Sequence, residues 1–342
     1  PSGFEISEQH TPAVFKPLED VRLPENKAEL AYFSLRQLAA LIQSRQISSE
    51  ELTRFFIDRL KVYDKELHCV ISLTEELALE QARKADKEIS QGNYRGLLHG
   101  IPYGAKDLLA TKQYPTTWGA MPYKDQQFAY DATVIQKLEE AGAVLVAKLS
   151  LGALAMGDVW YGERTRNPWN TETGSSGSSA GSASAVSAGL IPFAIGTETL
   201  GSIVSPSTTC GVTGLRPTFG RVSKYGAMAL SWSMDKIGPI ARSAEDAAIV
   251  FEAIYGPDGR DGSVIDAPFN YDYRNDPQKL RIGYLADAFS KSRFRKQDSL
   301  SLEVLKKLGY ELIPIQLPQL PNIRFILNAE AAAAFDELTR SD

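Results

Sequence analysis

Apolar residues recur with helical spacing in several stretches of the chain. Two of these stretches follow capping-box sequences, the SLRQ that begins at Ser34 and the SSEE that begins at Ser48. Residues 74–90 are also predicted to be helical. So is the amphipathic stretch 132–142, which ends in glycine, the residue type that best tolerates a left-handed helix cap. The N-terminal part of the chain is therefore predicted to contain several helices.

Short apolar runs predict strands between and after these helices. Residues 143–147 (AVLVA) predict a buried strand, whereas glycine and proline interrupt residues 100–107, which predicts a strand or a loop. The alternation of helices with apolar strands predicts an α/β fold. The later predicted elements are a capped helix from Ser243 to Tyr255, strands at 280–285 and 311–315, and a helix near 300–308.

The two ends of the chain differ from its middle. Residues 1–29 are rich in proline and charge without periodicity, which predicts an N-terminal arm, and residues 30–342 are expected to form a single domain. An Ala-rich helix without an evident partner precedes Asp342. We therefore expect the C-terminal part of the fold to be missing, and the start at Pro1 leaves N-terminal processing open.

Composition excludes several classes of function. The 342 residues are 43% hydrophobic and 23% charged with a net charge of −5, which is typical of a globular protein and gives no basic surface for nucleic acid or anionic membrane. No run of 18 apolar residues predicts a membrane span. Cys69 and Cys210 lie far apart, so neither a disulfide framework nor a thiolate metal site is expected. We expect a cytoplasmic protein that needs no metal or cofactor.

Residues 174–189 (GSSGSSAGSASAVSAG) consist almost wholly of glycine, serine and alanine. Such a composition is typical of a flexible linker. The sequence that follows, LIPFAI and then GTETLGSIV through residue 204, is apolar and punctuated by glycine, so this stretch runs directly into core. Small residues inside a core let backbone approach backbone or ligand. These serines are therefore candidates for chemistry.

Several serine chemistries could use this stretch. Residues 177–181 (GSSAG) match the G-x-S-x-G elbow with Ser179 as nucleophile, but that fold needs a later histidine. His10, His68 and His99 all precede it, so the elbow would require a histidine beyond Asp342. Ser233 to Lys236 matches S-x-x-K without its companion motifs, and neither a P-loop nor HExxH is present.

A lysine can serve as the base when histidine is absent. Lys106 lies in YGAKDLL, an apolar setting in which burial would lower the pKa of the amine and leave it neutral near neutral pH. The ordinary alternative is a lysine on the surface.

Three segments together resemble the amidase signature family. Members carry G-[IV]-P-x-x-x-K-D, then G-S-S-G-G-S, then G-T-D-x-G-G-S-I-R. Here these segments read GIPYGAKD at 100–107, GSSAGS at 177–182 and GTETLGSIV at 196–204, and Ser178 and Ser202 have the family spacing. Residues 167–169, 210–218 and 220–223 also look like family segments, within a resemblance that covers about 33–260.

The resemblance implies a fold with a large mixed β-sheet covered by helices, with core motifs between 100 and 225. It implies that Ser202 is the nucleophile, Ser178 a bridging serine on a cis peptide, and Lys106 the base. The expected oxyanion hole is formed by backbone N–H groups of Thr199, Leu200, Gly201 and Ser202. Substrate contacts are expected at Met156, Gly157, Asp158 and Ser179.

Three positions depart from the family pattern. Leu200 and Ala180 replace glycines, and Val204 replaces an arginine. Leu200 keeps a backbone N–H for the oxyanion hole but adds a bulky side chain beside it. Val204 removes a positive charge near the nucleophile.

The expected activity is hydrolysis of a carboxamide C–N bond in a small molecule through an acyl-enzyme. One alternative is the A subunit of a glutamyl-tRNA amidotransferase, which frees ammonia from glutamine. Met156-Gly157 favours that alternative, and Asp158 in place of a small hydroxyl residue counts against glutamine. Another alternative is a non-catalytic homologue that acts as a binding module. A homodimer stays open, and partner subunits are expected only for the amidotransferase.

Overall fold

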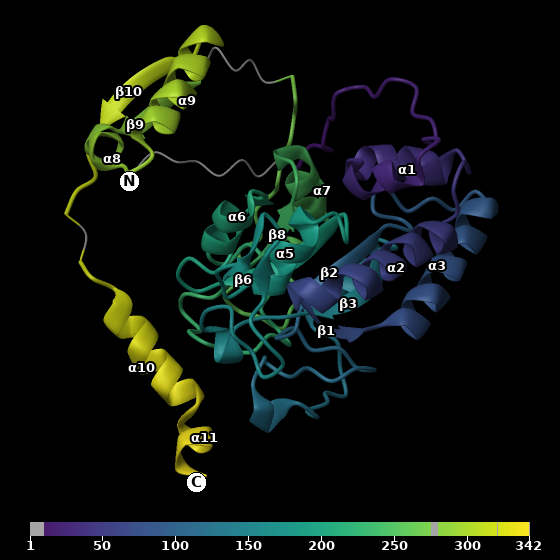
Figure 1. The fold of residues 1–342 in the computed structure, drawn as a ribbon, viewed down its shortest axis with the longest axis horizontal. Helices are drawn as coiled ribbons and strands as arrows, with labels where there is room; N and C mark the ends of the chain where they lie inside the picture. The colour runs from purple at the N-terminus through teal and green to yellow at the C-terminus, as the bar shows by residue number, and fades with distance from the viewer. Residues whose placement is uncertain (1–9, 275–279, 320, 342) are drawn as a thin grey trace. The chain divides into compact units, whose positions relative to one another are not determined.

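The computed structural model describes residues 10–274, 280–319 and 321–341 of the chain (Figure 1). These residues group into two compact units. The larger unit contains Leu18–Phe269 and the segment that starts at Ile326, and the smaller one contains Thr11–Pro17 and the described part of Asn270–Phe325. The expected single domain from residue 30 onward stays a prediction.

A six-stranded mixed sheet forms the centre of the larger unit, in the order β1-β3-β2-β6-β8-β7. Strand β2 runs parallel to β3 on one side and to β6 on the other, whereas β1, β8 and β7 join antiparallel to their neighbours. The bounds are β1 (Val70–Leu73), β2 (Pro102–Lys106), β3 (Val144–Leu149), β6 (Phe193–Glu198), β7 (Thr213–Gly214) and β8 (Lys236–Ala241). The large mixed sheet that the family resemblance implies is thus confirmed.

The inner strands are buried along their whole length, which explains why they read as unbroken apolar runs. Every residue of β2, β3, β6 and β8 is buried. The strand predicted at 143–147 is confirmed as β3, and the interrupted segment 100–107 contains β2. Two lysines, Lys106 on β2 and Lys148 on β3, are also fully buried, and their amines need polar partners inside the protein.

Local capping starts the helices where the sequence predicts them. Ser34 and Ser48 both form complete capping boxes, with Gln37 and Glu51 respectively. The side chain of Ser243 accepts a hydrogen bond from the N–H of Asp246 at the start of α7. The helix bounds are α1 (Leu35–Gln43), α2 (Ser49–Leu67), α3 (Glu75–Ser90), α4 (Thr133–Glu140), α5 (Ala180–Ser187), α6 (Val204–Cys210) and α7 (Ala244–Ile254).

The Gly/Ser-rich stretch is part of the core and not a linker. Residues 180–186 of α5 are all buried, and the helix packs against β6 and β8. Leucines and isoleucines of α2, together with alanines of α3 and α5, form one apolar cluster with β3. Small side chains along α5 therefore allow a helix to lie close to the sheet.

The smaller unit has its own short parallel sheet of β9 (Arg281–Leu285) and β10 (Glu311–Ile315), with α8 (Ala286–Lys291) and α9 (Arg295–Lys307). Both strands lie where the sequence predicts them, and α9 begins before the predicted 300. Part of the predicted N-terminal arm belongs here, because the N–H of Val14 donates to the carbonyl of Tyr271.

The remaining short elements complete the chain. They are the 3-10 helices η1 (Lys27–Tyr32), η2 (Met121–Tyr123) and η3 (Ala153–Ala155), the hairpin of β4 (Arg166–Asn167) and β5 (Asn170–Gly174), and helices α10 (Arg324–Ala334) and α11 (Asp336–Arg340). The Ala-rich α10, for which the sequence suggests no partner, has one: the Glu330 carboxylate accepts hydrogen bonds from Ser231 and Ser233.

Across the described ranges, none of the helices combines the length and the apolar character that a membrane span requires.

Candidate active site

The sheet and α5 bring the predicted lysine and serine together. Lys106 is the last residue of β2, and Thr197 lies near the end of the adjacent parallel strand β6. Ser178 and Ser179 directly precede α5, which packs across these strands. Residues far apart in the sequence therefore meet where two parallel strands end, a common place for sites in α/β folds.

The amine of Lys106 is enclosed by oxygen atoms. Its Nζ lies 2.8 Å from Ser178 Oγ, 3.2 Å from Ser179 Oγ, 2.9 Å from Thr197 Oγ1 and 3.3 Å from the Thr197 carbonyl oxygen. Lys106 and Ser179 are fully buried, and Ser178 is nearly so. Thr197 was missed by sequence reasoning, although it follows Gly196 inside one of the three family segments.

Burial lowers the pKa of Lys106 to about 7, and the negative charges of Asp235 and Glu198 oppose this shift. Adjacent Asp107 points elsewhere, as its Oδ1 lies 2.7 Å from Lys148 Nζ. Its other oxygen accepts hydrogen bonds from the N–H and hydroxyl of Thr117. The amine of Lys106 is therefore poised to be neutral or charged near neutral pH.

The loop before Ser178 is held by close backbone packing. A side chain at Gly177 would overlap the carbonyl oxygen of Gly157, so only glycine fits here. The Gly177–Ser178 peptide bond is cis, as the family resemblance implies. The carboxylate of Asp158 accepts a hydrogen bond from the N–H of Ser176 at 3.2 Å and lies 3.4 Å from Arg164 Nε.

Ser202 lies in the loop between β6 and α6 and is partly exposed. Its carbonyl oxygen accepts a hydrogen bond from the N–H of Ser179 at 3.1 Å, which connects the two serine-bearing loops. Among the described residues its hydroxyl makes no hydrogen bond, so Lys106 and Ser178 are in direct contact while Ser202 is joined to them through backbone.

The same loop presents N–H groups that the protein does not use. Within the described part of the chain, no hydrogen bond is donated by the N–H of Leu200, Gly201 or Ser202. Thr199 is fixed at the start of the loop, because its hydroxyl donates to Asp235 Oδ1 at 2.5 Å and its carbonyl accepts from Lys236 Nζ at 3.0 Å. Free N–H groups beside a serine can stabilise an oxyanion.

The expected substrate residues differ in their exposure. Met156 is 64% exposed, whereas Ser179 is buried with its hydroxyl bonded to Thr197. Gly157 and Asp158 contact the loop that precedes Ser178. Thus Met156 is free to meet a ligand, and the other three contact the loops that hold the catalytic candidates.

A cavity of about 80 Å³ lies beside Thr197 and Thr199. Its walls are largely apolar, including Leu108, Met228, Leu230 and Trp232, and Asp235 and Lys236 also line it. Within the described ranges, no group of three or more His, Cys, Asp or Glu side chains is arranged to hold a metal ion.

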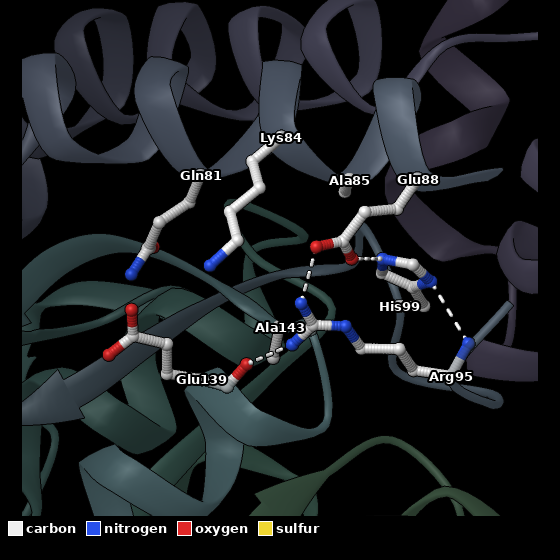
Figure 2. A pocket seen from close by; sticks show the side chains of 9 residues that line it. Gln81, Lys84, Ala85, Glu88, Arg95, His99, Glu139 and Ala143 are labelled. Atoms are coloured by element: carbon white, nitrogen blue, oxygen red, sulfur yellow. Dashed lines mark hydrogen bonds and ion pairs between the residues drawn. The ribbon is translucent and has the colours of Figure 1, made fainter. Parts of the chain in front are cut away.

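His99 lies in a different region and is held in a polar network (Figure 2). Its Nε2 lies 3.1 Å from Glu88 Oε2, and its Nδ1 accepts a hydrogen bond from the N–H of Arg95. Burial, and then the charge of Arg95, lower the pKa of His99, whereas Glu88 raises it. His68 ends α2 in a left-handed conformation. Neither histidine is among the partners of Lys106.

Comparison with known proteins gives consistent matches. Residues 51–342 match the family profile described as Amidase. One relative is the glutamyl-tRNA(Gln) amidotransferase A-chain protein of Methylococcus capsulatus, 41% identical over 298 residues, a match that covers 84% of this chain and 61% of that protein. The corresponding protein of Coxiella burnetii is 38% identical over 295 residues, with 83% and 61% coverage.

Solved structures agree with this match. The native peptide amidase of Stenotrophomonas maltophilia superposes with a TM-score of 0.81 at 34% identity, covering 90% of this chain and 68% of the other. The chain spans about three fifths of the length of the curated relatives it matches. On the family profile and these relatives, the chain belongs to the amidase family.

Proposed function

We propose that the protein hydrolyses carboxamides through an acyl-enzyme on Ser202, with Ser178 and Lys106 as a proton relay. The observation that supports this most is the fully buried Lys106 amine, 2.8 Å from Ser178 Oγ, with its pKa lowered to about 7. A neutral amine in this position can accept a proton from a serine hydroxyl.

In the acylation step, neutral Lys106 takes the proton of Ser178, and Ser178 takes the proton of Ser202. The Ser202 oxygen then attacks the amide carbon, and the carbonyl electron pair moves to oxygen. The free N–H groups of Leu200, Gly201 and Ser202 stabilise that oxyanion. Collapse breaks the C–N bond, and the relay returns a proton to the leaving nitrogen.

Deacylation uses the same groups with water as the nucleophile. The relay removes a proton from water, the hydroxide adds to the ester carbon, and Ser202 leaves with the proton returned by Ser178. The products are a carboxylic acid and an amine or ammonia, and every side chain recovers its starting state.

Covalent labelling with a fluorophosphonate tests this assignment. Ser202→Ala should abolish both labelling and amide hydrolysis, because Ser202 is the serine that lies in the loop with the free N–H groups. Ser205→Ala is the matched control, since Ser205 is exposed three residues away and its hydroxyl contacts Ser176. Labelling that persists in Ser202→Ala, or that maps to Ser179, would contradict the proposed nucleophile.

A second candidate function is favoured by the named relatives. Several of them, 37–41% identical, are A-chain proteins of a glutamyl-tRNA(Gln) amidotransferase. The largely apolar cavity beside Thr197 favours an uncharged acyl group over glutamine. We therefore expect the isolated protein to hydrolyse aliphatic or aryl amides. Glutamine hydrolysis that appears only with added partner proteins would favour the amidotransferase instead.

A further inference from the structure

The carboxylate of Glu198 closes the loop that carries the candidate nucleophile. Glu198 is the last residue of β6 and is 5% exposed. Its Oε2 accepts hydrogen bonds from the N–H of Ile203 at 2.8 Å and of Val204 at 2.9 Å. These are the two residues directly after Ser202, so one side chain ties the end of the loop back to the strand where the loop begins.

The charge on Glu198 is balanced differently from the family motif. That motif has aspartate at this position and arginine at the position of Val204. Here the acid is one methylene longer and the arginine is absent. Arg216 supplies a cation from outside the motif, with its Nε 3.7 Å from Glu198 Oε1.

The other bonds of the loop leave its end dependent on Glu198. Thr199 is fixed by Asp235 and Lys236, and the Ser202 carbonyl accepts the N–H of Ser179. Leu200 and Gly201 lie between these fixed points with N–H groups that no described residue accepts. Because both N–H groups after Ser202 end on one buried carboxylate, its removal frees the C-terminal end of the loop.

We propose that Glu198 is a positioning residue for Ser202, which holds the nucleophile and the adjacent N–H groups in their reactive arrangement. The proposal rests on the proposed function of Ser202. Glu198 itself does not touch the reacting atoms.

Three substitutions separate the position of this side chain from its charge. Glu198→Ala removes both acceptors and should lower kcat by about 100-fold with a much smaller change in KM, since a small displacement of reacting groups has an effect of that size. Glu198→Asp keeps the charge but is too short to reach both N–H groups, so kcat should also fall. Glu198→Gln keeps one neutral acceptor and should give an intermediate loss.

The pH dependence gives a readout that a purely structural role would not move. The charged groups that act around Glu198 are Arg216, Lys236 and Lys106. The negative charge of Glu198 raises the pKa of Lys106, so Glu198→Gln should displace the rising limb of the rate profile to lower pH. Glu198→Asp should leave that limb in place.

The experiment uses the intact protein, with hydrolysis of a simple aryl amide and the rate of fluorophosphonate labelling as measurements. Exposed Glu172→Gln on β5 is the control and should match wild type in both. Wild-type kcat and labelling rate in Glu198→Ala would overturn the positioning role, as would a rise in KM alone. If Glu198→Ala does not fold, the Asp and Gln variants carry the same test. A wild-type protein that is neither active nor labelled would instead refute the proposed function.

Discussion

At Lys106, one buried amine has to be both tolerated by the fold and available for chemistry. Burial of a charged ammonium is costly, and this lowers its pKa towards neutrality. Oxygen atoms of Ser178, Ser179 and Thr197 surround the amine, so it is hydrogen-bonded without a carboxylate in contact. A contacting carboxylate would hold the amine protonated and remove its basicity.

This environment predicts a specific pH dependence. Below pH 7 the amine is protonated and cannot take a proton, so kcat/KM should fall about tenfold for each further pH unit. Above the pKa of about 7 the rate should reach a plateau. Steady-state hydrolysis measured across this range checks the prediction, and a rate that does not change through pH 7 would contradict it.

Substitution of the same residue separates a base from a positioning charge. Lys106→Arg should lower turnover on the order of a thousandfold or more, since guanidinium stays protonated. Exposed Lys65→Arg on α2 is the control and should leave turnover unchanged. An active Lys106→Arg protein would show that a positive charge, not a base, is needed.

At the scale of single elements, β2 and β3 are joined by a second buried lysine. Lys148 Nζ lies 2.7 Å from Asp107 Oδ1 and also donates to the hydroxyls of Thr111 and Thr116. Both charged residues are fully buried. The pair directs Asp107 to the side of β3 and fixes the segment that follows Lys106.

Removal of one partner should therefore leave a buried, unpaired charge. Lys148→Met is expected to lower the free energy of unfolding by about 3–5 kcal/mol. The exposed pair of Lys124 and Asp125 is the control, and Lys124→Met should cost about 0–1 kcal/mol. Urea unfolding of both variants measures the difference, and equal stabilities would show that Asp107 finds another partner.

At the scale of the larger unit, residues near the start of the chain are bound to residues more than 200 positions later. Asp246 at the start of α7 accepts a hydrogen bond from the N–H of Leu35 at 2.9 Å, and Arg242 donates to the carbonyl of Phe33. Arg36 pairs with Glu245 at 3.1 Å. These contacts fasten α1 to the far end of the sheet.

The buried acceptor at Asp246 should contribute measurably to stability. Asp246→Ala leaves the Leu35 N–H without a partner and should lower the free energy of unfolding by about 1–3 kcal/mol. Asp246→Asn keeps an acceptor and should lower it less. Asp125→Ala, on the surface, should change stability by no more than about 0.5 kcal/mol. A loss of stability no larger in Asp246→Ala than in Asp125→Ala would mean that α1 is held by apolar packing alone.

The sequence by itself determined the features that depend on neighbouring residues. Capping chemistry located the starts of α1, α2 and α7, and the apolar run at 143–147 located β3. The motif segments named Lys106 and Ser178, because residue type and spacing are visible without a fold.

Only the tertiary structure decided what those residues touch. Thr197, Glu198 and Asp235 gain their importance from the pairing of β6 with β2 and β8, which no local pattern encodes. Burial of Lys106, the turning of Asp107 towards Lys148 and the closure of the Ser202 loop by Glu198 all depend on strands and helices from distant parts of the chain. Periodicity reports which face of an element is apolar, whereas the pKa of a buried group and the partner of a buried charge are set by long-range packing.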